Sequence, residues 1–478
     1  MTTVDAQLAQ LESLRAAAAD KLDQQFMRGR RFQWYYDGEY EIIALLDTAE
    51  RQTFRKLLQE AGADWCELVV NAVAERLQVV GFRFDNGGSD MAWQIWQDSC
   101  MDADSEMVQT DALVTGQSFA LVQPSDDSPT GVEITAESPF EATVLYQPGD
   151  RRHRIAGYKR FAGDAMDYPW PAWMGATAAG QTEVLMTPDV IATWPSGGSG
   201  PEIMANPAGL VGMVELVPQP RTWGPPRSEL TPAAPIQDRI NTTIFNRLVA
   251  SDYGAFRQIW ASGVKIPRNV VQVTGDDGTV TETVAYQAPF QVGADRLLAN
   301  ENPAARFGSF AESTLAGYLN SVEQDVNQLA AITQTPPHYL LGQIANLSAD
   351  AIKAAEAGLV AKVSRRSLHI GEGWEEVIRT AFRIIGHPAA NDRAGEVIWK
   401  DFETRSEAQR VDALVKMRTL GVPIEVLWAR WGATPQEIDQ WRAMRAQEEA
   451  GGQLAPQPVP APASGRDNAP APTLPLKE

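Results

Sequence analysis

Two apolar stripes at helical spacing, separated by a short β-branched segment, constrain this chain more than any other feature of its sequence. Residues 231–262 and 306–334 each place large aliphatic side chains three or four positions apart, which is typical of amphipathic helices. The stripe residues are Ile236, Ile240, Ile244 and Leu248 in the first helix, and Leu315, Leu319, Val322 and Val326 in the second. Two such helices cannot bury both stripes by themselves.

The segment between the two helices, VVQVTGDDGTVTETVAY, consists of two β-branched runs around a tight turn. Glycine and aspartate tolerate the positive φ angles that such a turn needs, so the pattern predicts a β-hairpin. The turn residues are Gly275, Asp276, Asp277 and Gly278.

An apolar, proline-containing segment over 335–347 follows the second helix. Pro336 and Pro337 end that helix, because a residue that precedes proline is disfavoured in the helical region. The other residues of interest in this segment are His338, Tyr339, Leu340, Leu341, Gln343 and Ile344. Ser348 is a good N-cap for a long helix over 348–388. Its three glycines, Gly358, Gly371 and Gly373, predict a kink.

The first 230 residues mix helices and strands without strict alternation, which predicts an α+β fold. We expect helices over 3–27, 48–79 and 104–115, with an aromatic turn, RFQWYYDGEYEI, after the first. Gly81 and Gly116 are expected to end the second and third helices. Short strands are expected in VEITAE, EATVLYQ, IAGYKRFA and TEVLMTP. Residues 164–230, rich in Trp, Pro and Gly, show no clear pattern.

The last quarter of the chain is expected to be mainly helical. EVIWKDFE predicts one more strand, and three short helices are expected over 405–420, 423–431 and 435–448. Residues 451–478 contain seven prolines and few large apolar side chains. Such a segment cannot bury enough surface to fold, so we expect a disordered tail.

Composition limits the classes of partner. The chain carries 61 acidic and 41 basic residues, a net charge of −20. This balance disfavours tight nucleic-acid binding, which needs Lys and Arg, but it is compatible with DNA sliding past. No apolar run approaches the roughly 20 residues that span a bilayer. Cys66 and Cys100 lie far apart, which is typical of a reducing compartment. We therefore expect a soluble protein, intracellular when made, with no membrane partner.

The sequence contains no catalytic or cofactor signature. It has no GxxxxGK[ST], HExxH or GxSxG motif, so we expect no enzyme, cofactor or metal site. Asp102, Asp104 and Glu106 resemble the start of a calcium loop, but the glycine at the sixth place and the acid at the twelfth are missing. A metal-dependent nuclease that uses these three acids is one alternative. Short basic clusters at 28–31, 151–154 and 365–366 indicate solvated faces or subunit salt bridges rather than a DNA site.

The order of these segments resembles the portal protein of tailed double-stranded DNA phages, of the siphophage type, from about residue 5 to residue 445. Four stretches carry the resemblance. They are YYDGEYEI, WCELVVNAVAERLQVVGF, the helix–hairpin–helix over 231–333, and TPPHYLLGQIANLSADAIKAAEAGLVAKV.

The resemblance implies a ring subunit with an α+β wing, a helical stem, a small β clip, a long kinked tunnel helix and a helical crown. The implied parts are the wing (1–230), stem helix one (231–262), the clip (263–305), stem helix two (306–334), the tunnel loop (335–347), the tunnel helix (348–388), a wing return strand (389–403), the crown (404–450) and the tail (451–478).

The same resemblance implies a dodecameric ring in the virion, at one capsid vertex. Double-stranded DNA would pass through it during packaging and ejection without being read, and the ring would bind the terminase large subunit, the head–tail adaptor, and capsid and scaffold proteins. Head-to-tail packing of neighbouring copies would bury the two stripes. The apolar loop would line a constriction, or its side chains would pack under the adjacent helix. Another alternative is a virion adaptor that binds partners through its Pro-rich tail.

Overall fold

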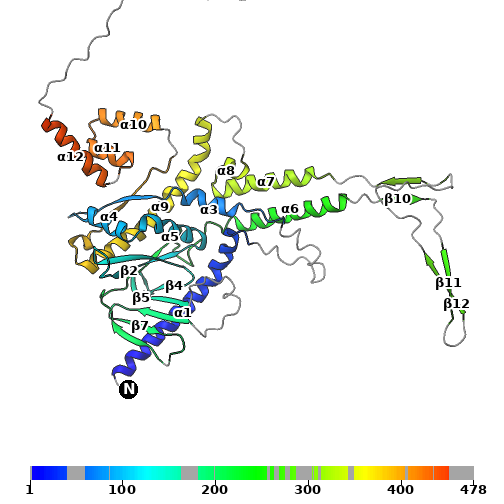
Figure 1. Cartoon of the computed structure of the whole chain (residues 1–478), viewed down its shortest axis with the longest axis horizontal. Coiled ribbons are helices and arrows are strands. Elements are labelled where there is room, and N and C mark those ends of the chain that lie inside the picture. Colours follow the sequence, from blue (N-terminus) through cyan, green and yellow to red (C-terminus); the bar gives the residue numbers. More distant parts are fainter. Residues whose placement is uncertain are drawn as a thin grey trace, which may run out of the picture. The chain divides into compact units, whose positions relative to one another are not determined.

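The fold is α+β and divides into two compact units, residues 1–403 and 404–478 (Figure 1). The computed structural model describes residues 3–39, 60–85, 87–162, 181–198, 200–255, 259–262, 268–274, 280–286, 304, 306–309, 314–342, 349–403, 407–433 and 435–451.

The described helices of the first unit are α1 (Thr3–Tyr36), α3 (Cys66–Ala74), α4 (Gly88–Asp98), α5 (Met101–Thr115), α6 (Ala234–Ala255), α7 (Ala316–Thr333), α8 (Pro337–Leu341) and α9 (Ala349–Ile385), with a 3-10 turn, η2 (Pro388–Asn391). The described helices of the second unit are α10 (Glu407–Thr419), α11 (Ile424–Trp431) and α12 (Pro435–Gly451).

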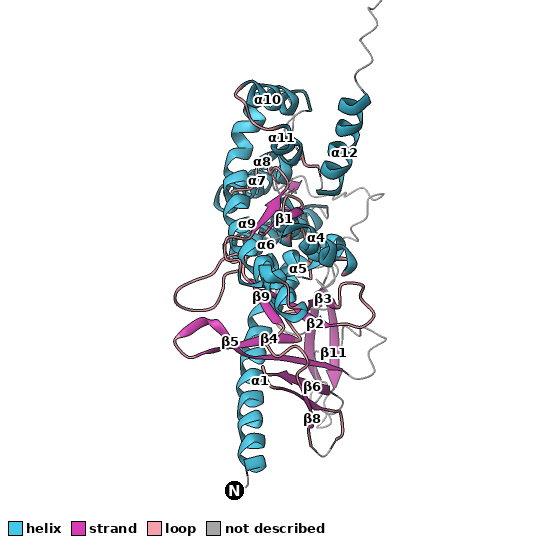
Figure 2. Cartoon of the chain, turned by 90° about the vertical axis from the view of Figure 1, so that its left-hand side faces the viewer, coloured by secondary structure: helices cyan, strands magenta, loops and turns pink. Residues whose placement is uncertain are grey.

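The described strands all pair antiparallel (Figure 2). They are β1 (Val79–Arg83), β2 (Ser118–Pro124), β3 (Val132–Glu137), β4 (Ala142–Gln147), β5 (Asp150–Ala162), β6 (Gln181–Met186), β7 (Val190–Trp194), β8 (Glu202–Ala205), β9 (Met213–Leu216), β10 (Ile259–Ser262), β11 (Arg268–Thr274), β12 (Val280–Tyr286), β13 (Arg306–Ser309) and β14 (Glu396–Trp399). A three-stranded sheet has the order β3-β2-β9, a five-stranded sheet the order β4-β5-β6-β7-β8, and β1-β14, β10-β13 and β11-β12 form separate pairs.

The main core surrounds α9. Trp374 of α9 is fully buried and meets Trp96 of α4 edge-to-face, with ring centroids 5.0 Å apart. Phe82 of β1 contacts the same Trp96 ring at 5.2 Å. Aromatic pairs in this geometry are more favourable than their buried area alone implies. The helix therefore holds together elements that are distant in the sequence.

A second, smaller core lies under α1. Leu11, Ala18 and Leu22 of this helix are buried against Ala156 and Tyr158 of β5 and their neighbours. Figure 1 shows α1 running along the five-stranded sheet.

The first predicted helix is longer than expected. It continues to Tyr36, so the aromatic residues 32–36 belong to its last turns rather than to a turn of their own. Gly29 lies within this helix. A Cβ at that position would come within 3.0 Å of the Phe140 ring, and glycine permits this close contact. Gly38, with φ of +69°, follows the helix end.

The helix predicted over 48–79 is shorter than expected in its described part. Residues 62–65 are not helical, α3 ends at Ala74, and β1 begins at Val79 and passes through Gly81. Residues 48–59 lie outside the described residues. The helix that ends at Gly116 is confirmed, and Gly116 adopts φ of +97°.

The helix–hairpin–helix pattern is present, with two corrections to the helix bounds. β11 and β12 pair from Thr274 with Val280 outward, as a hairpin requires. The turn residues Gly275, Asp276, Asp277 and Gly278 lie outside the described residues. The first helix ends at Ala255, not at 262, because Ile259–Ser262 pairs as a strand with Arg306–Ser309. For the same reason the second helix does not start at 306, and α7 begins at Ala316.

Residues 335–347 are not simply a loop. Pro337 stands at the first turn of α8, where its missing N–H costs no hydrogen bond, so the two prolines start a short helix after ending α7. α9 is continuous through Gly358, Gly371 and Gly373. A Cβ at Gly373 would lie 3.0 Å from Leu216, so this glycine permits close packing on β9. The predicted kink stays a prediction.

The strand and helices predicted for the last quarter are confirmed, although β14 is shorter than expected and covers only Glu396–Trp399. β14 pairs with β1, so strands from the two ends of the first unit lie side by side. Residues 452–478 lie outside the described residues.

Candidate functional site: the base of the α6–α7 pair

Helices α6 and α7 lie side by side, and the chain runs outward along α6 and returns along α7 (Figure 1). At their base the stripe residues are covered by the core around α3 and α9. Ile236, Ile240, Ile244 and Val326 are buried. A single chain thus buries part of both stripes, through elements outside the helix pair.

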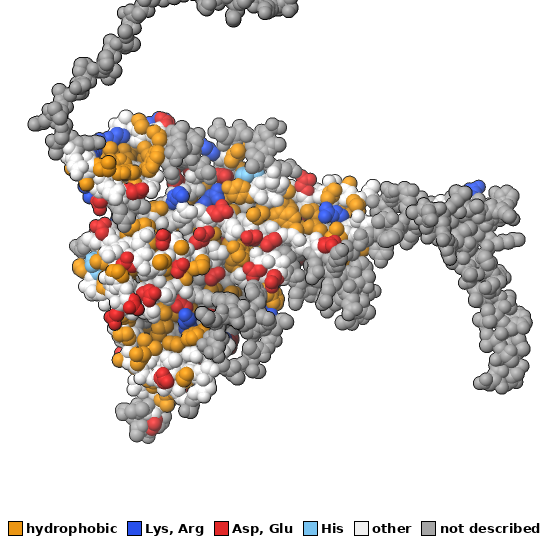
Figure 3. Space-filling model, viewed as in Figure 1, with side chains coloured by type: hydrophobic (Ala, Val, Ile, Leu, Met, Phe, Trp, Pro, Cys, Tyr) orange, Lys and Arg blue, Asp and Glu red, His pale blue; other side chains and the backbone are white. Residues whose placement is uncertain are grey.

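Farther out, the pair is less covered. Leu248, Leu315 and Val322 are half-buried, and Leu319 is 51% exposed. On the same helix, Ile332 is 50% exposed. Figure 3 shows hydrophobic side chains gathered along these two helices. Leu315, Leu319 and Val322 share one face of α7, and a contiguous, partly exposed apolar face is typical of an interaction surface.

An arginine links the two helices of the pair. Arg239 of α6 forms an ion pair with Asp325 of α7 at 2.9 Å and donates to Gln328. The Arg239 side chain is 49% exposed, so the pair contributes little to stability but favours one register of α6 against α7.

Buried amides attach α6 to residues 61–65. Gln237 is fully buried, donates to the carbonyl oxygen of Ala63 and accepts from the backbone N–H of Trp65 at 3.2 Å. Asn241, one turn later, accepts from the N–H of Ala63 at 3.3 Å. These long-range bonds satisfy backbone groups that a helix would otherwise pair, which explains why this segment is not helical.

The end of α1 reaches the same helix. The Tyr35 hydroxyl donates to the Asp238 carboxylate at 2.7 Å. Burial, together with this carboxylate, raises the pKa of Tyr35 to about 12. Tyr35, one of the aromatic residues predicted to form a turn, therefore anchors α1 on α6.

Most of α8 packs inside the chain. The indole N–H of Trp65 donates to the carbonyl oxygen of Leu340 at 2.9 Å, and Leu340 is only 7% exposed. Arg76 donates to the Tyr339 hydroxyl at 2.8 Å, and this hydroxyl donates to Glu356 of α9 at 3.2 Å. α8 is thus held between α3 and α9.

The structure divides the predicted loop residues into three groups. Pro336 and Leu340 are buried, His338, Tyr339 and Leu341 are half-buried, and Pro337 is exposed. Gln343 and Ile344 lie outside the described residues. Among the described residues, the alternative that these side chains pack under the adjacent helix fits Leu340 and Tyr339.

A buried ionic cluster joins the segment before α6, the end of α7 and the middle of α9. Glu229 forms ion pairs with Lys362 at 3.1 Å and with Arg366, and accepts from Gln219 at 2.7 Å. Lys362 also donates to the carbonyl oxygen of Thr333, the last residue of α7, at 2.9 Å. Both the Glu229 and Lys362 side chains are under 5% exposed.

Electrostatics keep Glu229 ionised. Burial alone would raise the pKa of Glu229, but the charges of Lys362 and Arg366 outweigh it and hold this pKa below its ordinary value. The cluster therefore holds three elements together, because separating its buried charges has a large cost in free energy. One weak sign of the cluster is visible in the sequence, a lysine three residues after Leu359, which is buried on the apolar side of α9.

Two of the three basic clusters contain intrachain ion pairs. Arg154 of β5 binds Glu376 of α9 at 2.8 Å and donates to the carbonyl oxygen of Met213 at 3.0 Å. Arg366 binds Glu229. These two arginines join parts of one chain, rather than forming the solvated faces or subunit salt bridges that we expected.

The acids considered for a nuclease do not form a site in the described part of the chain. Asp102 and Glu106 are exposed on α5 and Asp104 is half-buried. Among the described residues, no group of His, Cys, Asp or Glu side chains is arranged to hold a metal ion. None of the described helices is long and apolar enough to cross a membrane.

Comparison with known proteins identifies relatives of the whole arrangement. Residues 209–451 match the family described as phage portal protein, SPP1 Gp6-like. The chain is 30% identical to the portal protein of Mycobacterium phage L5 over 441 residues, which is 87% of this chain and 85% of that protein. It is also 30% identical to the portal protein of Mycobacterium phage D29 over 442 residues, with the same coverage.

Among solved structures, a chain from the virion of a native gene transfer agent particle aligns with a TM-score of 0.38 and 14% identity, over 80% of this chain and 88% of that chain. The family match includes the described parts of α6 to α12, and the two phage proteins extend the likeness over most of the sequence. The chain belongs to the SPP1 Gp6-like family of phage portal proteins.

Proposed function

We propose that copies of this chain form the ring-shaped channel through which a phage genome is packaged and ejected. As a phage portal protein, the chain is a structural component of the virion at the capsid vertex, in an oligomeric ring. The observation that carries the channel proposal is the α6–α7 pair, which is clamped at its base yet exposes Leu319 farther out on α7.

The parts of the subunit are assigned as follows. α6 and α7 are the stem, and the pairs β10-β13 and β11-β12 belong to the clip, which on this assignment begins at Ile259. α9 is the tunnel helix, and α10, α11 and α12 form the crown. The remaining described elements, with β14 returning to β1, are the wing. The paired strands at the far ends of the stem helices support this assignment.

We assign fewer residues of the predicted tunnel loop to the bore than the sequence suggested. Leu340 and Tyr339 contact α3 and α9 and anchor α8. We assign bore contact to the exposed Pro337 and to Gln343 and Ile344, which follow α8 in the chain.

The partners are a dodecameric ring of the same chain, double-stranded DNA that passes without sequence readout, the terminase large subunit, the head–tail adaptor, and capsid and scaffold proteins. The net charge of −20 supports weak contact with DNA, because a channel should not hold the phosphate backbone.

Electron microscopy of the purified protein tests the ring. We expect rings with a central hole, and a monomer that persists at high concentration would contradict the proposal. Leu319→Asp should block assembly, because it places a charge on the exposed apolar surface of α7. Gln324→Asp adds the same charge at an exposed polar position of the same helix and should assemble normally.

The bore assignment needs a separate test. The double substitution Gln343→Ser and Ile344→Ser should leave rings intact but impair genome packaging or retention in infected cells. Failure of ring assembly in this variant would make these residues part of a subunit interface instead. Normal assembly with normal packaging would remove them from the channel constriction.

A further inference from the structure

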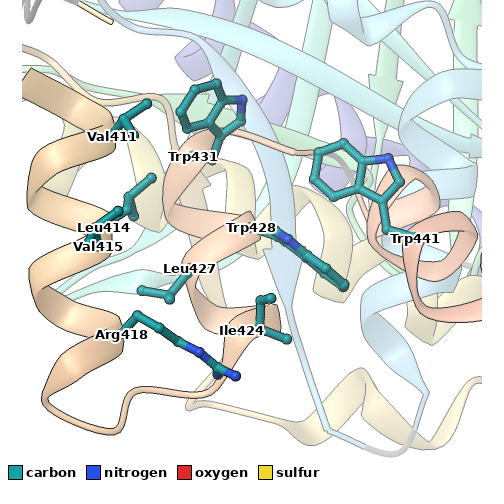
Figure 4. A pocket seen from close by; sticks show the side chains of 9 residues that line it. All are labelled: Val411, Leu414, Val415, Arg418, Ile424, Leu427, Trp428, Trp431 and Trp441. Carbon is teal, nitrogen blue, oxygen red and sulfur yellow. The ribbon is translucent and has the colours of Figure 1, made fainter. Parts of the chain in front are cut away.

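An apolar groove opens between the three helices of the second unit (Figure 4). It has a volume of about 390 Å³, and its lining includes three indole rings, those of Trp428, Trp431 and Trp441. Arg418 is the one charged residue among the described residues that line it. In Figure 4, Trp431 of α11 lies beside Val411 of α10, and Trp428 points toward the side on which Trp441 of α12 lies.

Two walls of the groove, α11 and α12, are fixed relative to one another. Trp428 and Trp441 meet edge-to-face with ring centroids 5.4 Å apart. Arg442, next to Trp441, forms an ion pair with Glu425 of α11 at 3.1 Å. The groove is therefore formed before anything binds in it, which lowers the entropic cost of binding.

The groove also exposes apolar surface to solvent. Val411 and Val415, on the α10 wall, are 43% and 55% exposed. Contiguous exposed apolar surface lined by aromatic rings is typical of a binding site. The chemistry of the lining calls for an apolar, uncharged ligand, because a charge would lose its hydration there without gaining a partner other than Arg418.

The chain itself supplies a segment of that kind. Residues 452–465, GQLAPQPVPAPASG, directly follow α12 and contain no charged residue. The prolines of the segment are Pro456, Pro458, Pro460 and Pro462. Proline-rich segments bind aromatic-lined grooves because their restricted backbone loses little freedom on binding.

The spacing along the chain matches the groove. From Trp441 to Gly451, α12 extends about 15 Å at about 1.5 Å per residue. An extended proline-rich segment covers about 3.1 Å per residue, so five residues after Gly451 cover about 16 Å. A chain that reverses at Gly451 and Gly452 thus brings Pro456 back to Trp441. The next six residues cover about 19 Å, enough to cross helices packed about 8–10 Å apart.

We propose that the groove between α10, α11 and α12 binds the segment Pro456–Pro462 of the same chain. This inference stands independently of the channel function. It also gives the tail a binding site within its own subunit, so the segment is held by the crown helices and is not free to recruit another protein.

Photo-cross-linking in the full-length protein tests this site. p-Benzoylphenylalanine replaces Val459 within the segment or, as a matched control, Asn468 outside it. Mass spectrometry should map cross-links from position 459, but not from position 468, to peptides of α10–α12 around Trp428 and Trp441. The product should migrate as a single chain on a denaturing gel.

Two variants with the cross-linker at position 459 should lose most of this product. Trp441→Ala removes an indole ring from the groove. Substituting serine for Pro456, Pro458, Pro460 and Pro462 leaves the helices unchanged, so it remains informative if Trp441→Ala alters their packing. Cross-links that join two chains would overturn the proposal in favour of a neighbouring copy. Absence of cross-links to these helices, or a yield that the serine variant does not lower, would also overturn it.

Discussion

Replacing Glu229 by Gln should destabilise the protein more than replacing Lys362 by Met. Glu229→Gln leaves the cations of Lys362 and Arg366 without their carboxylate, and their side chains are only 3% and 13% exposed. Removing one partner from such a buried group costs about 3–5 kcal/mol. After Lys362→Met, Glu229 keeps Arg366 and Gln219, so no buried charge loses all of its partners, and the loss is that of the Lys362 contacts with Glu229 and the Thr333 carbonyl, about 1.5–3 kcal/mol.

The two variants should also differ in their response to pH. The pKa of Glu229 lies below its ordinary value in the folded chain. Ionisation of Glu229 therefore stabilises the fold fully at pH values above that ordinary pKa. This contribution is lost as the pH falls through the folded pKa. The destabilisation by Glu229→Gln should therefore be largest near neutral pH and shrink in acid.

Guanidinium unfolding followed by far-UV circular dichroism, at one fixed protein concentration, gives the comparison. Glu396→Gln is the matched control, because its ion pair with Arg83 is exposed on both sides and should contribute only about 0–1 kcal/mol. Equal losses for Glu229→Gln and Glu396→Gln would refute the argument that the buried cluster holds the three elements together. A larger loss for Lys362→Met than for Glu229→Gln would refute the assignment of Arg366 as the second partner.

Three further tests, two of them with a control variant, address other parts of the fold by thermal or chemical unfolding. Leu340→Ala should lower the free energy of unfolding by about 2–5 kcal/mol, because it opens a cavity beneath α8. Pro337→Ala, at the exposed start of that helix, should lower it far less. Similar losses of stability in the two variants would show that α8 is not anchored by Leu340. Gly212→Ala should prevent normal folding, because its Cβ would come within 2.1 Å of a β2 carbonyl oxygen. Gly317→Ala, in open space on α7, should stabilise the protein by about 0.5–1 kcal/mol. A more stable Gly212→Ala than Gly317→Ala would contradict these environments. Burial raises the pKa of Asp111 from 3.8 to about 6, so the folded chain loses stability as the pH rises through this interval. Asp111→Asn should recover about 3 kcal/mol near neutral pH and flatten the dependence of stability on pH. An unchanged pH dependence would disprove the pKa shift.

Local rules were sufficient for the parts of the fold whose boundaries depend on nearby residues. The helix ending at Gly116 and the β11–β12 pair follow from residues that need positive φ or favour strands. The three helices of the second unit likewise follow from breaks at Gly421 and Pro423 and before Pro435.

The parts that sequence reasoning missed depend on long-range contacts. Gly29 lies within a helix because it meets Phe140, more than a hundred positions later. Residues 62–65 are not helical because Gln237 and Asn241 bind this segment from α6. No local propensity carries this information. At the base of the α6–α7 pair, the sequence identified Tyr339 and Leu340 as important, but not that α3 and α9 would cover them.

Three ionic contacts along α9 explain how one helix can specify the position of so many elements. Near its start, Glu356 lies 3.8 Å from Arg76 and accepts from Tyr339; in its middle, Lys362 binds Glu229; near its end, Glu376 binds Arg154. Apolar contacts alone would tolerate a shift of the helix by a turn with partial repacking. A shifted helix would instead leave several charges buried without partners, at several kcal/mol each. We therefore expect α9 to move as a rigid body with the elements it joins, and motion within a subunit to arise outside these three contacts.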